Sequence, residues 1–505
     1  MPARSPAPDV PVPPGGPASL TAAECLARRA VFNVRDYGAV GDGTVDDTDA
    51  IYAACRALRA AEGGTLRIPP GIYRVGRQTA TRAAGRGYAW RPAPIVDIRD
   101  CPGPVVIEGA GAVLRLAPGL RYGCFHPVTG RPHTPAALPF TAADYRAAPV
   151  EAGLVTLIGN ASVTVRGLEL DGQSGAYVLG GAWGDVGIQV SATGLYLYNN
   201  ARALVENVYT HHHGLDGYMV GVPGLTEASP ATPHTFNNVR SEYNGRNACS
   251  WIGGRGFTWV NPTFNHAGRG AVRSPPSAGL DIEAEQSVCR DGLVVGGEAV
   301  NNAGPGVVAD SGDGGYTTFR RFTAWAGGAW AVFARKPQLV FEDCTLFGQT
   351  TVYTASRPED GTRLLRCRLE DRDHPTYGAV YRSGMTLDAP VANYFEADGC
   401  EIVGRVNKPI YLSAAPGRAT AARLRHTRLV VMNATLPPAD FQVYLSNVVL
   451  TQVRVIDALT GPPPRPGYYV EAGAGNVIER GVVVPSTIRY GNAVSGAVGE
   501  LRRSP

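Results

Sequence analysis

Short segments of similar sequence recur through the middle of the chain, and this repetition constrains the fold more than any other feature. Successive segments start 31, 23, 36, 24, 22, 23, 33 and 27 residues apart, at Asn207, Asn238, Asn261, Gly297, Arg321, Asp343, Arg366, Gly399 and His426. A period in the low twenties, lengthened by insertions, is the length of one β-helical coil, which holds three short strands and three bends. Such a coil buries its apolar side chains only when it is stacked on its neighbours. The sequence therefore predicts an all-β solenoid.

One column of small residues supports this stacking. Cys344, Cys367, Cys400 and Thr427 stand at the same place in four successive segments. Small side chains at equivalent positions stack inside a β-helix, so we expect these cysteines to pack in the core rather than to form disulfides or to bind a metal. The chain has nine cysteines but no CxxC pair, which argues against a zinc ribbon or a thioredoxin-type site.

Composition agrees with a chain of short strands and excludes several kinds of partner. The 505 residues include 63 Gly and 40 Pro, and only 18% are charged. The net charge of +4 permits an acidic polysaccharide partner, but there is no concentrated basic stripe of the kind typical of nucleic-acid binding. No apolar run reaches the roughly 18 residues of a membrane span, and the N-terminus shows no signal peptide. We expect a protein with no nucleic-acid or membrane partner, either extracellular or carried on a virion.

A segment rich in glycine and aspartate precedes the repeats. It reads DYGAVGDGTVDDTDAI from Asp36 and GGTLRIPPGIY from Gly63. The pattern predicts a helix over Thr48–Ala61 with Asp47 or Thr48 as N-cap, followed by a strand that a Pro-Gly turn closes.

These two stretches resemble the N-terminal signature of the pectate-lyase-like and polygalacturonase-like superfamily of right-handed parallel β-helices, which includes phage tailspike depolymerases. The resemblance implies a short N-terminal cap helix and a first coil. It also implies structural rather than catalytic roles for Asp42, Asp46 and Asp47. Tailspike-like relatives are trimers, so we expect a monomer or a homotrimer, although the chain carries no coiled-coil heptads.

The expected organisation has three parts. Residues 1–31 form a Pro-rich arm, residues 32–490 a single right-handed parallel β-helix, and residues 491–505 a C-terminal tail. Within the β-helix, residues 32–75 hold the cap helix and the first coil. From about residue 340 onward the coils resemble scaffold, because they lack a cluster of acidic residues.

The strand after each aligned glycine can be assigned two faces by alternation. Small or apolar residues are expected to point inward, at Gly217, Met219, Ala248, Ser250, Ile282, Ala284, Val307, Ala309, Ala331 and Phe333. The opposite face then carries Asp216, Tyr218, Asn247, Trp251, Asp281, Glu283, Glu285 and Asp310.

Paired carboxylates on this outer face predict acid–base chemistry. Asp281, Glu283 and Glu285 alternate along one strand, so like charges would lie roughly 7 Å apart on the same side. Such a cluster is destabilising unless a member is protonated or a cation or substrate neutralises it. A protonated acid and an ionised partner are what glycoside hydrolysis requires. We therefore expect Asp281 and Glu283 to be the acid/base pair of a polysaccharide hydrolase.

Other residues are expected to assist this pair. Glu285, Asp310 and Asp216 would tune the two acids or position water, with Asp310 beside Glu285 on the next coil. Substrate contacts are expected from the rings of Tyr218 and Trp251 and from the polar groups at Arg246, Asn247, His213, His266, Arg269, Arg273, Arg335 and Lys336. Arg269 and Arg273 lie in an insertion that would reach the groove edge, where they could meet an anionic substrate.

The sequence predicts no metal site. The run His211–His213 looks like a metal motif, but alternation sends adjacent strand residues to opposite faces. A bend or surface location fits these residues better, with His213 or His266 contacting the groove. Asp171, within Leu-Asp-Gly, is interpreted as part of a turn.

Two alternatives to the hydrolase stay open. In a lyase, the same carboxylates would bind Ca²⁺, and Arg335 or Lys336 would take the C5 proton of a uronate. In a receptor-binding or structural β-helix, the groove would hold a glycan without turnover. No cofactor is expected for the hydrolase. The Asn-Thr-Asp, Asp-Asp, Gly-His-Gly and Arg-Ile-Lys motifs of polygalacturonases are not found in this groove, so the catalytic residues of that family are not transferred.

Overall fold

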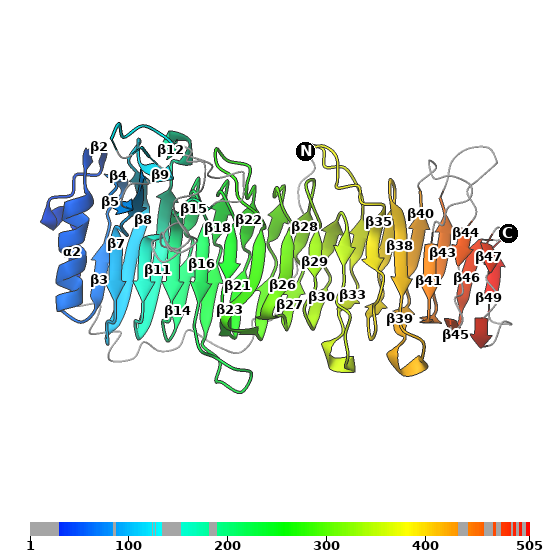
Figure 1. The fold of residues 1–505 in the computed structure, drawn as a ribbon. Coiled ribbons are helices and arrows are strands. Elements are labelled where there is room, and N and C mark those ends of the chain that lie inside the picture. The colour runs from blue at the N-terminus through cyan, green and yellow to red at the C-terminus, as the bar shows by residue number, and fades with distance from the viewer. Residues whose placement is uncertain are drawn as a thin grey trace, which may run out of the picture.

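The chain winds into an elongated stack of parallel strands (Figure 1). The computed structural model describes residues 30–83, 87–123, 125–126, 128–133, 153–180, 189–432, 443–458, 468–470, 476–485, 488–490, 494–496 and 501–504. The Pro-rich arm predicted for residues 1–31 lies almost wholly outside the described residues. Successive coils add one strand to each of three columns, and strands of one column pair in parallel with those of the neighbouring coils. The stack is a right-handed parallel β-helix, as the repeats predicted.

The first column carries the candidate groove. Its strands are β7 (Val96–Arg99), β10 (Gly153–Ile158), β13 (Thr193–Tyr198), β16 (Tyr218–Gly221), β19 (Cys249–Trp251), β23 (Leu280–Arg290), β26 (Val307–Gly314), β29 (Val332–Ala334), β32 (Thr350–Thr351), β35 (Met385–Ala389), β38 (Lys408–Ser413) and β41 (Val443–Ser446). The short strand β20 (Gly254–Arg255) pairs with the far end of β23.

The second and third columns form the other walls. Strands β8 (Pro104–Leu116) and β11 (Ser162–Asp171) run through both columns. The second column also has β1 (Val31–Asn33), β3 (Gly64–Arg67), β14 (Ala203–Glu206), β17 (His234–Asn237), β21 (Phe257–Val260), β24 (Gly292–Val295), β27 (Thr317–Arg320), β30 (Leu339–Glu342), β33 (Arg363–Leu365), β36 (Glu396–Asp398), β39 (Ala422–Arg425), β42 (Val448–Thr451), β45 (Asn476–Arg480) and β48 (Val494–Gly496). The third also has β2 (Asp42–Asp46), β4 (Gly71–Val75), β15 (Tyr209–His211), β18 (Arg240–Glu242), β22 (Thr263–Asn265), β25 (Glu298–Val300), β28 (Thr323–Trp325), β31 (Thr345–Phe347), β34 (Arg368–Glu370), β37 (Glu401–Gly404), β40 (Arg428–Val431), β43 (Arg454–Asp457), β46 (Val482–Pro485) and β49 (Leu501–Ser504).

Short elements decorate the stack. They are the hairpin β5 (Gln78–Ala83) and β6 (Gly87–Pro92), the pair β9 (Arg121–Gly123) and β12 (Val178–Gly180), the pair β44 (Tyr468–Val470) and β47 (Ile488–Tyr490), and the 3₁₀ turns η1 (Val34–Tyr37), η2 (Ser174–Ala176), η3 (Pro358–Asp360) and η4 (Arg418–Thr420). Strands β48 and β49 pair with β45 and β46, so the stack continues into residues 491–505, where the sequence placed a tail. Among the described residues, no helix is long and apolar enough to cross a membrane.

A single left-handed residue makes the bend between the second and third columns in coil after coil. These residues have φ between 47° and 65°: Asn207, Asn238, Asn261, Gly296, Arg321, Asp343, Arg366, Gly399, His426, Gln452 and Gly481. Gly and Asn recur here because they tolerate positive φ better than other residues. All nine repeat starts inferred from the sequence fall on this bend, Gly297 one residue after Gly296. The repeat register is confirmed.

The expected cysteine column lies just after this bend and is confirmed. Cys344, Cys367 and Cys400 are 1–2% exposed, and none of the seven cysteines among the described residues is in a disulfide. Each of the three thiols donates to a strand carbonyl of the preceding coil, and Thr427 continues the column by donating to the Ala397 carbonyl at 3.3 Å. The column therefore satisfies backbone acceptors as well as filling the core.

The cap helix α2 (Thr48–Ala60) covers the N-terminal end of the stack (Figure 1) and buries Ile51, Ala54, Cys55 and Leu58. Asp47 stands at the N-cap position as predicted, but its carboxylate accepts from the backbone N–H groups of Val40 at 2.6 Å and Gly41 at 3.1 Å rather than from the helix.

The neighbouring aspartates bind backbone too. Asp42 accepts from the N–H groups of Thr44 and Val45, and Asp46 from that of Thr48. The structural roles that the resemblance implied for Asp42, Asp46 and Asp47 are confirmed.

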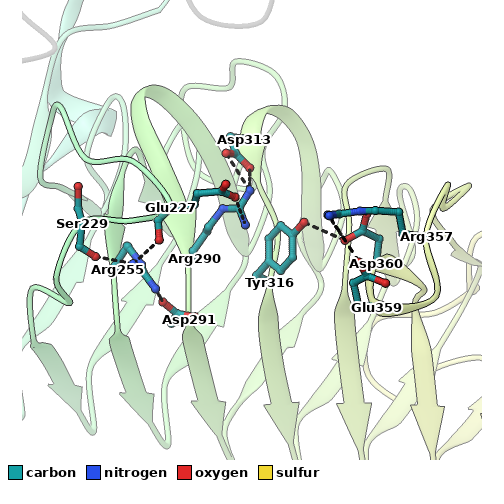
Figure 2. Close-up of polar contacts among 10 residues, drawn as sticks. All are labelled: Glu227, Ser229, Arg255, Arg290, Asp291, Asp313, Tyr316, Arg357, Glu359 and Asp360. Atoms are coloured by element: carbon teal, nitrogen blue, oxygen red, sulfur yellow. Dashed lines mark hydrogen bonds and ion pairs between the residues drawn. The ribbon is translucent and has the colours of Figure 1, made fainter.

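Ion pairs and a hydrogen bond tie coils together at the bend between the first and second columns (Figure 2). Arg255 donates to Asp291 at 2.8 Å, Arg290 to Asp313 at 2.9 Å, and the Tyr316 hydroxyl to Asp360 at 2.9 Å. The Arg290 guanidinium also lies 4.0 Å from the centre of the Tyr316 ring. Several of these groups are exposed, so each pair contributes little to stability by itself and mainly fixes the bend.

The bend column predicts how Gly399 responds to substitution. Gly399 has φ 65°, and a Cβ there would lie 3.3 Å from Cγ of Arg366. Gly399→Ala should lower the free energy of unfolding by about 1–2 kcal/mol, since alanine pays the steric cost of the left-handed conformation. Gly399→Asn, the matched control, should cost less. Urea unfolding of the three proteins checks this, and equal midpoints for the alanine and asparagine variants would contradict it.

Candidate active site

The acids predicted to form the catalytic cluster all project from the outer side of the first column. Leu280, Ile282 and Ala284 lie in the core, so the intervening Asp281, Glu283 and Glu285 point away from it. On the next strand Val307 and Ala309 lie in the core, which turns Asp310 outward. The strand register on which the proposed chemistry depends therefore holds for these four residues.

Two predicted ring contacts are wrong. In register, Tyr218 pairs with Cys249 and Cys249 with Leu280, which places the rings of Tyr218 and Trp251 inside the β-helix, 1% and 0% exposed. The Tyr218 hydroxyl donates to the Val208 carbonyl, and the Trp251 indole N–H donates to that of Gly253. The outward positions here are Met219 and Ser250.

The reason for the error is local. Ala248 and Ala331 are core residues as predicted, but the chain is still turning there, and the next residues, Cys249 and Val332, are core residues too. Alternation therefore begins one residue later than the sequence suggested in these coils. Large rings then occupy the inward positions because the core around them is aromatic: Trp251 stacks on Phe257, 5.4 Å away, and meets the edge of Trp259.

A bulge shapes the outer face between the two acidic strands. Asp281 pairs with Val308 and Glu283 with Ser311, so strand β26 has one residue more than β23 between these pairs. Asp310 lies in this bulge, opposite the span from Asp281 to Glu283, rather than beside Glu285 as predicted. Bulges re-aim side chains, and this one directs a carboxylate toward the pair.

Behind the acids lies a buried polar network. Arg246 donates through Nε and Nη2 to the two carboxylate oxygens of Asp216, at 2.8 and 2.6 Å, and both residues are almost fully buried. Ser250 and the backbone N–H of Asn247 also donate to Asp216, at 2.9 and 3.0 Å. The Asn247 side chain then donates to Asp281 at 2.9 Å, which links the ion pair to the acidic strand.

The two central carboxyls hold their protons more tightly than free carboxylic acids do. Burial and the neighbouring Glu283 raise the pKa of Asp281 well above its usual range, against the opposing effect of Arg246. Burial likewise raises the pKa of Glu283, with Glu285, Asp216 and Asp310 adding to the shift. Among the described residues, no group bonds the buried Oε2 of Glu283. Asp281 is 3% exposed while Glu283 is only partly buried, so Glu283 is the member that a substrate can reach.

A row of rings lies at the bend between the third and first columns, next to this face. His212 stacks on Tyr243 at 5.2 Å, Tyr243 stacks on His266 at 4.5 Å, and His266 meets the edge of Tyr377 at 5.2 Å. His212, Tyr243 and His266 each stand two residues before an aligned glycine, so the aligned repeats contained the signal that would have predicted this row. His266 belongs to the row, 5% exposed.

His213 does not face solvent. It is 0% exposed, its Nε2 lies 3.1 Å from the Leu170 carbonyl, and burial lowers its pKa to about 3. The prediction that adjacent histidines point to opposite faces is wrong for His211 and His212, whose Nδ1 atoms lie 2.7 Å apart. His212 lies at a bend, as predicted, with φ 55°, which breaks the alternation.

The predicted cationic contacts separate into two groups. Arg269 and Arg273 are exposed in the insertion, which is held beside Arg246 by a 2.8 Å hydrogen bond from Ser274 N–H to the Gly245 carbonyl. Burial and repulsion from Arg273 lower the pKa of Arg269, as expected for two cations that share one edge. Arg335 instead lies against Phe333 and acts on Asp388, and neither it nor Lys336 is among the main charges acting on Asp281 or Glu283.

The arrangement can perform acid–base chemistry at an open face. It combines two carboxyls of raised pKa, a buried ion pair behind them, the exposed acids Glu285 on the same strand and Asp310 on the next, and a cationic edge. The class of protein is therefore a parallel β-helix with an acidic site on its outer wall.

Known proteins agree with this fold. The family described as rhamnogalacturonase A/epimerase, pectate lyase-like, matches residues 31–82. Mannuronan C5-epimerase AlgE6 of Azotobacter vinelandii is 32% identical over 228 residues, 42% of this chain and 23% of the relative, and alginate lyase 7 of the same organism is 59% identical over 44 residues, 9% of this chain and 5% of the relative. The chain thus spans less than a quarter of the length of the curated relatives it matches.

A solved structure, the N-terminal fragment of bacteriophage Phi29 gene product 12, covers 92% of this chain and 72% of its own at TM-score 0.50 and 14% identity, a likeness of fold. The A-module of AlgE6 aligns over 90% of this chain and 99% of its own at TM-score 0.41 and 18% identity. Residues 31–82 thus carry the signature of a pectate-lyase-like family, and the chain as a whole has the right-handed parallel β-helix fold.

The buried ion pair predicts a large loss of stability when it is broken. Arg246→Met leaves the Asp216 carboxylate buried without its cation, which should lower the free energy of unfolding by about 3–5 kcal/mol. Arg320→Met, which removes the exposed partner of Glu342, is the matched control and should cost about 0–1 kcal/mol. Urea unfolding monitored by circular dichroism measures both, and similar losses would show that the buried pair has no special role.

Proposed function

We propose that the protein is a polysaccharide-modifying enzyme that removes the C5 proton of a uronate residue, with Glu283 as the proton acceptor. The observation that carries the proposal is the pair Asp281 and Glu283, two neighbouring carboxyls of raised pKa on an outer wall. Catalytic bases work best when their pKa is close to the working pH, and burial beside a second carboxyl moves Glu283 in that direction. The sequence similarity to a mannuronan C5-epimerase and an alginate lyase supports a uronate polymer as substrate and C5 as the position of the reaction.

Electrostatics fit an anionic polymer. Four ionised carboxylates would repel a uronate, whereas a protonated Asp281 leaves the face less negative. Arg269 and Arg273 supply positive charge at the neighbouring edge, where a uronate carboxylate can be paired. Asp281 acts from behind as a positioning residue, because it is nearly inaccessible and is held by Asn247.

The chemical step balances without an oxidant. The C5–H bond breaks, its proton passes to the Glu283 carboxylate, and the electron pair is delocalised into the uronate carboxylate. A proton returned from water to the opposite face, with Glu283 giving up its proton to solvent, completes the C5 epimer. If instead the C4–O bond breaks, the sugar becomes unsaturated and the leaving oxygen takes up a proton.

Hydrolysis is the second candidate, and the raised pKa of Glu283 favours it as well. A carboxyl of raised pKa keeps its proton to higher pH and can protonate a glycosidic oxygen while an ionised neighbour activates water. In this case Glu283 is the acid, and activity falls as rising pH removes its proton. If Glu283 is the base, activity rises over the same range. The pH profile therefore distinguishes the two chemistries.

The decisive experiment incubates the full chain with polymannuronate, with alginate and with neutral polysaccharides in D₂O, with and without EGTA. Deuterium at C5, which reports epimerisation, or an ultraviolet-absorbing unsaturated end, which reports elimination, supports the proposal. New reducing ends without unsaturation would replace it by hydrolysis, and glycan binding without any product would leave a receptor-binding β-helix. The EGTA arm tests whether turnover requires Ca²⁺, an ion that the oxygens of the exposed Glu285 and Asp310 would suit.

Glu283→Gln should reduce turnover about 10²–10⁴-fold, since the amide cannot accept or give the proton. Turnover of polymannuronate is measured against Glu342→Gln, a matched control on the second column. The same change should stabilise the fold increasingly as pH rises. A raised pKa in the folded state gives the wild type stability that is complete below the unfolded pKa and is lost as pH rises through the folded value.

Urea midpoints measured from acid to alkaline pH provide the second readout. Unchanged turnover in the Glu283→Gln variant would remove the residue from the mechanism. A difference in stability that does not change with pH would contradict the raised pKa.

A further inference from the structure

Three potential metal ligands converge at the bend between the third and first columns. Asp171 ends β11, His211 ends β15, and His212 follows at the bend. One ligand atom from each lies within 4.8 Å of the others. The Nδ1 atoms of His211 and His212 are 2.7 Å apart, and Oδ1 of Asp171 lies 3.7 Å from Nδ1 of His211.

The backbone explains how these side chains meet. Asp171 and His211 are register partners on adjacent coils, so their side chains lie on the same face of the sheet. His212 would point away in a regular strand, but its φ of 55° turns its ring back toward His211. On the other side the His212 ring stacks on Tyr243, which holds it in place.

Neighbouring groups orient the ligand atoms. Glu169 Oε1 lies 3.2 Å from Nε2 of His211, so that nitrogen carries the hydrogen and Nδ1 presents its lone pair. Arg115 donates to Oδ2 of Asp171 at 2.8 Å, and Oδ1, which accepts from the Gln173 N–H at 3.0 Å, lies on the side of the histidines. A carboxylate on the far nitrogen of a histidine and a hydrogen-bonded carboxylate ligand are typical of the groups that surround protein metal sites.

We propose that Asp171, His211 and His212 bind a divalent transition-metal ion of the zinc type. Two imidazoles and one carboxylate suit Zn²⁺, with the fourth position left to water or a substrate oxygen, whereas Ca²⁺ prefers oxygen ligands alone. Ligands at zinc distances stand about 3.4 Å apart in a tetrahedral site, so shifts of under about 1 Å would bring these atoms into place. An ion between the rings would let both Nδ1 lone pairs bind metal.

The site is separate from the acidic cluster and does not depend on the proposed function. It lies at the bend between the third and first columns, among the stacked rings of His212, Tyr243 and His266, just before the strand that follows Asp216. A metal ion at this site would bind a sugar oxygen at one end of the outer face.

The test uses the full chain after dialysis against EDTA. Titration with Co²⁺, followed by calorimetry and visible absorption, should give one equivalent bound with the intensity of a four-coordinate nitrogen and oxygen site, and Zn²⁺ should displace it. His212→Asn and Asp171→Asn should each weaken binding more than about tenfold. Asparagine suits the bend, since Asn301 has φ 56° at another bend between these columns.

His266→Asn is the matched control, because His266 has φ 59° in the same ring row but lies outside the triad, and it should bind Co²⁺ like the wild type. Glu169→Gln leaves the three proposed ligands in place and removes only the carboxylate that orients His211. It should therefore weaken Co²⁺ binding roughly 10–100-fold. Circular dichroism confirms that each variant is folded. Absence of stoichiometric Co²⁺ or Zn²⁺ binding by the wild type, or full binding by a folded Asp171→Asn or His212→Asn variant, overturns the proposal.

Discussion

Every other property of this molecule depends on the in-register stacking of one coil on the next. A coil of about two dozen residues has no core of its own, so its apolar side chains are buried only by its neighbours. Parallel pairing then places residues from distant parts of the sequence in straight columns, as with Tyr218, Cys249 and Leu280. A residue's partners are therefore the residues one coil away, and a site is built across coils.

That constraint explains how an acidic cluster can exist on a sheet. Like charges at one strand spacing are unfavourable, and the structure meets them in two ways. Arg246 neutralises Asp216 from beneath, while the raised pKa values of Asp281 and Glu283 lower the negative charge that these two carboxyls carry at a given pH. Neither the buried ion pair nor the raised pKa of the two carboxyls improves the packing of the core. A chain selected for stability alone would have apolar or neutral residues there, and this is why the face is interpreted as functional.

The sequence predicted what repeats and missed what depends on a single backbone angle. The bend column and the cysteine column follow from equivalent positions in successive coils, and so do the outward acids of β23, since strict alternation holds there. Tyr218 and Trp251 were misplaced because alternation starts one residue late in their coils. His211 and His212 were predicted to lie on opposite faces because the sequence does not reveal the positive φ of His212. The contact between Arg246 and Asp216 joins two coils whose side-chain rotamers no repeat pattern specifies.

The family model matches the cap, whereas the candidate site lies on a wall further along the chain. The cap is held by close backbone contacts. A Cβ on Gly71 would lie 2.6 Å from the Gly41 carbonyl oxygen, and the Asp47 carboxylate binds the N–H groups of Val40 and Gly41. On the wall from Asp216 to Asp310, packing constrains the inward residues, while the outward residues do not have to fit the core. The coil and the cap therefore follow from packing, and the chemistry has to be deduced from the outward residues of this chain.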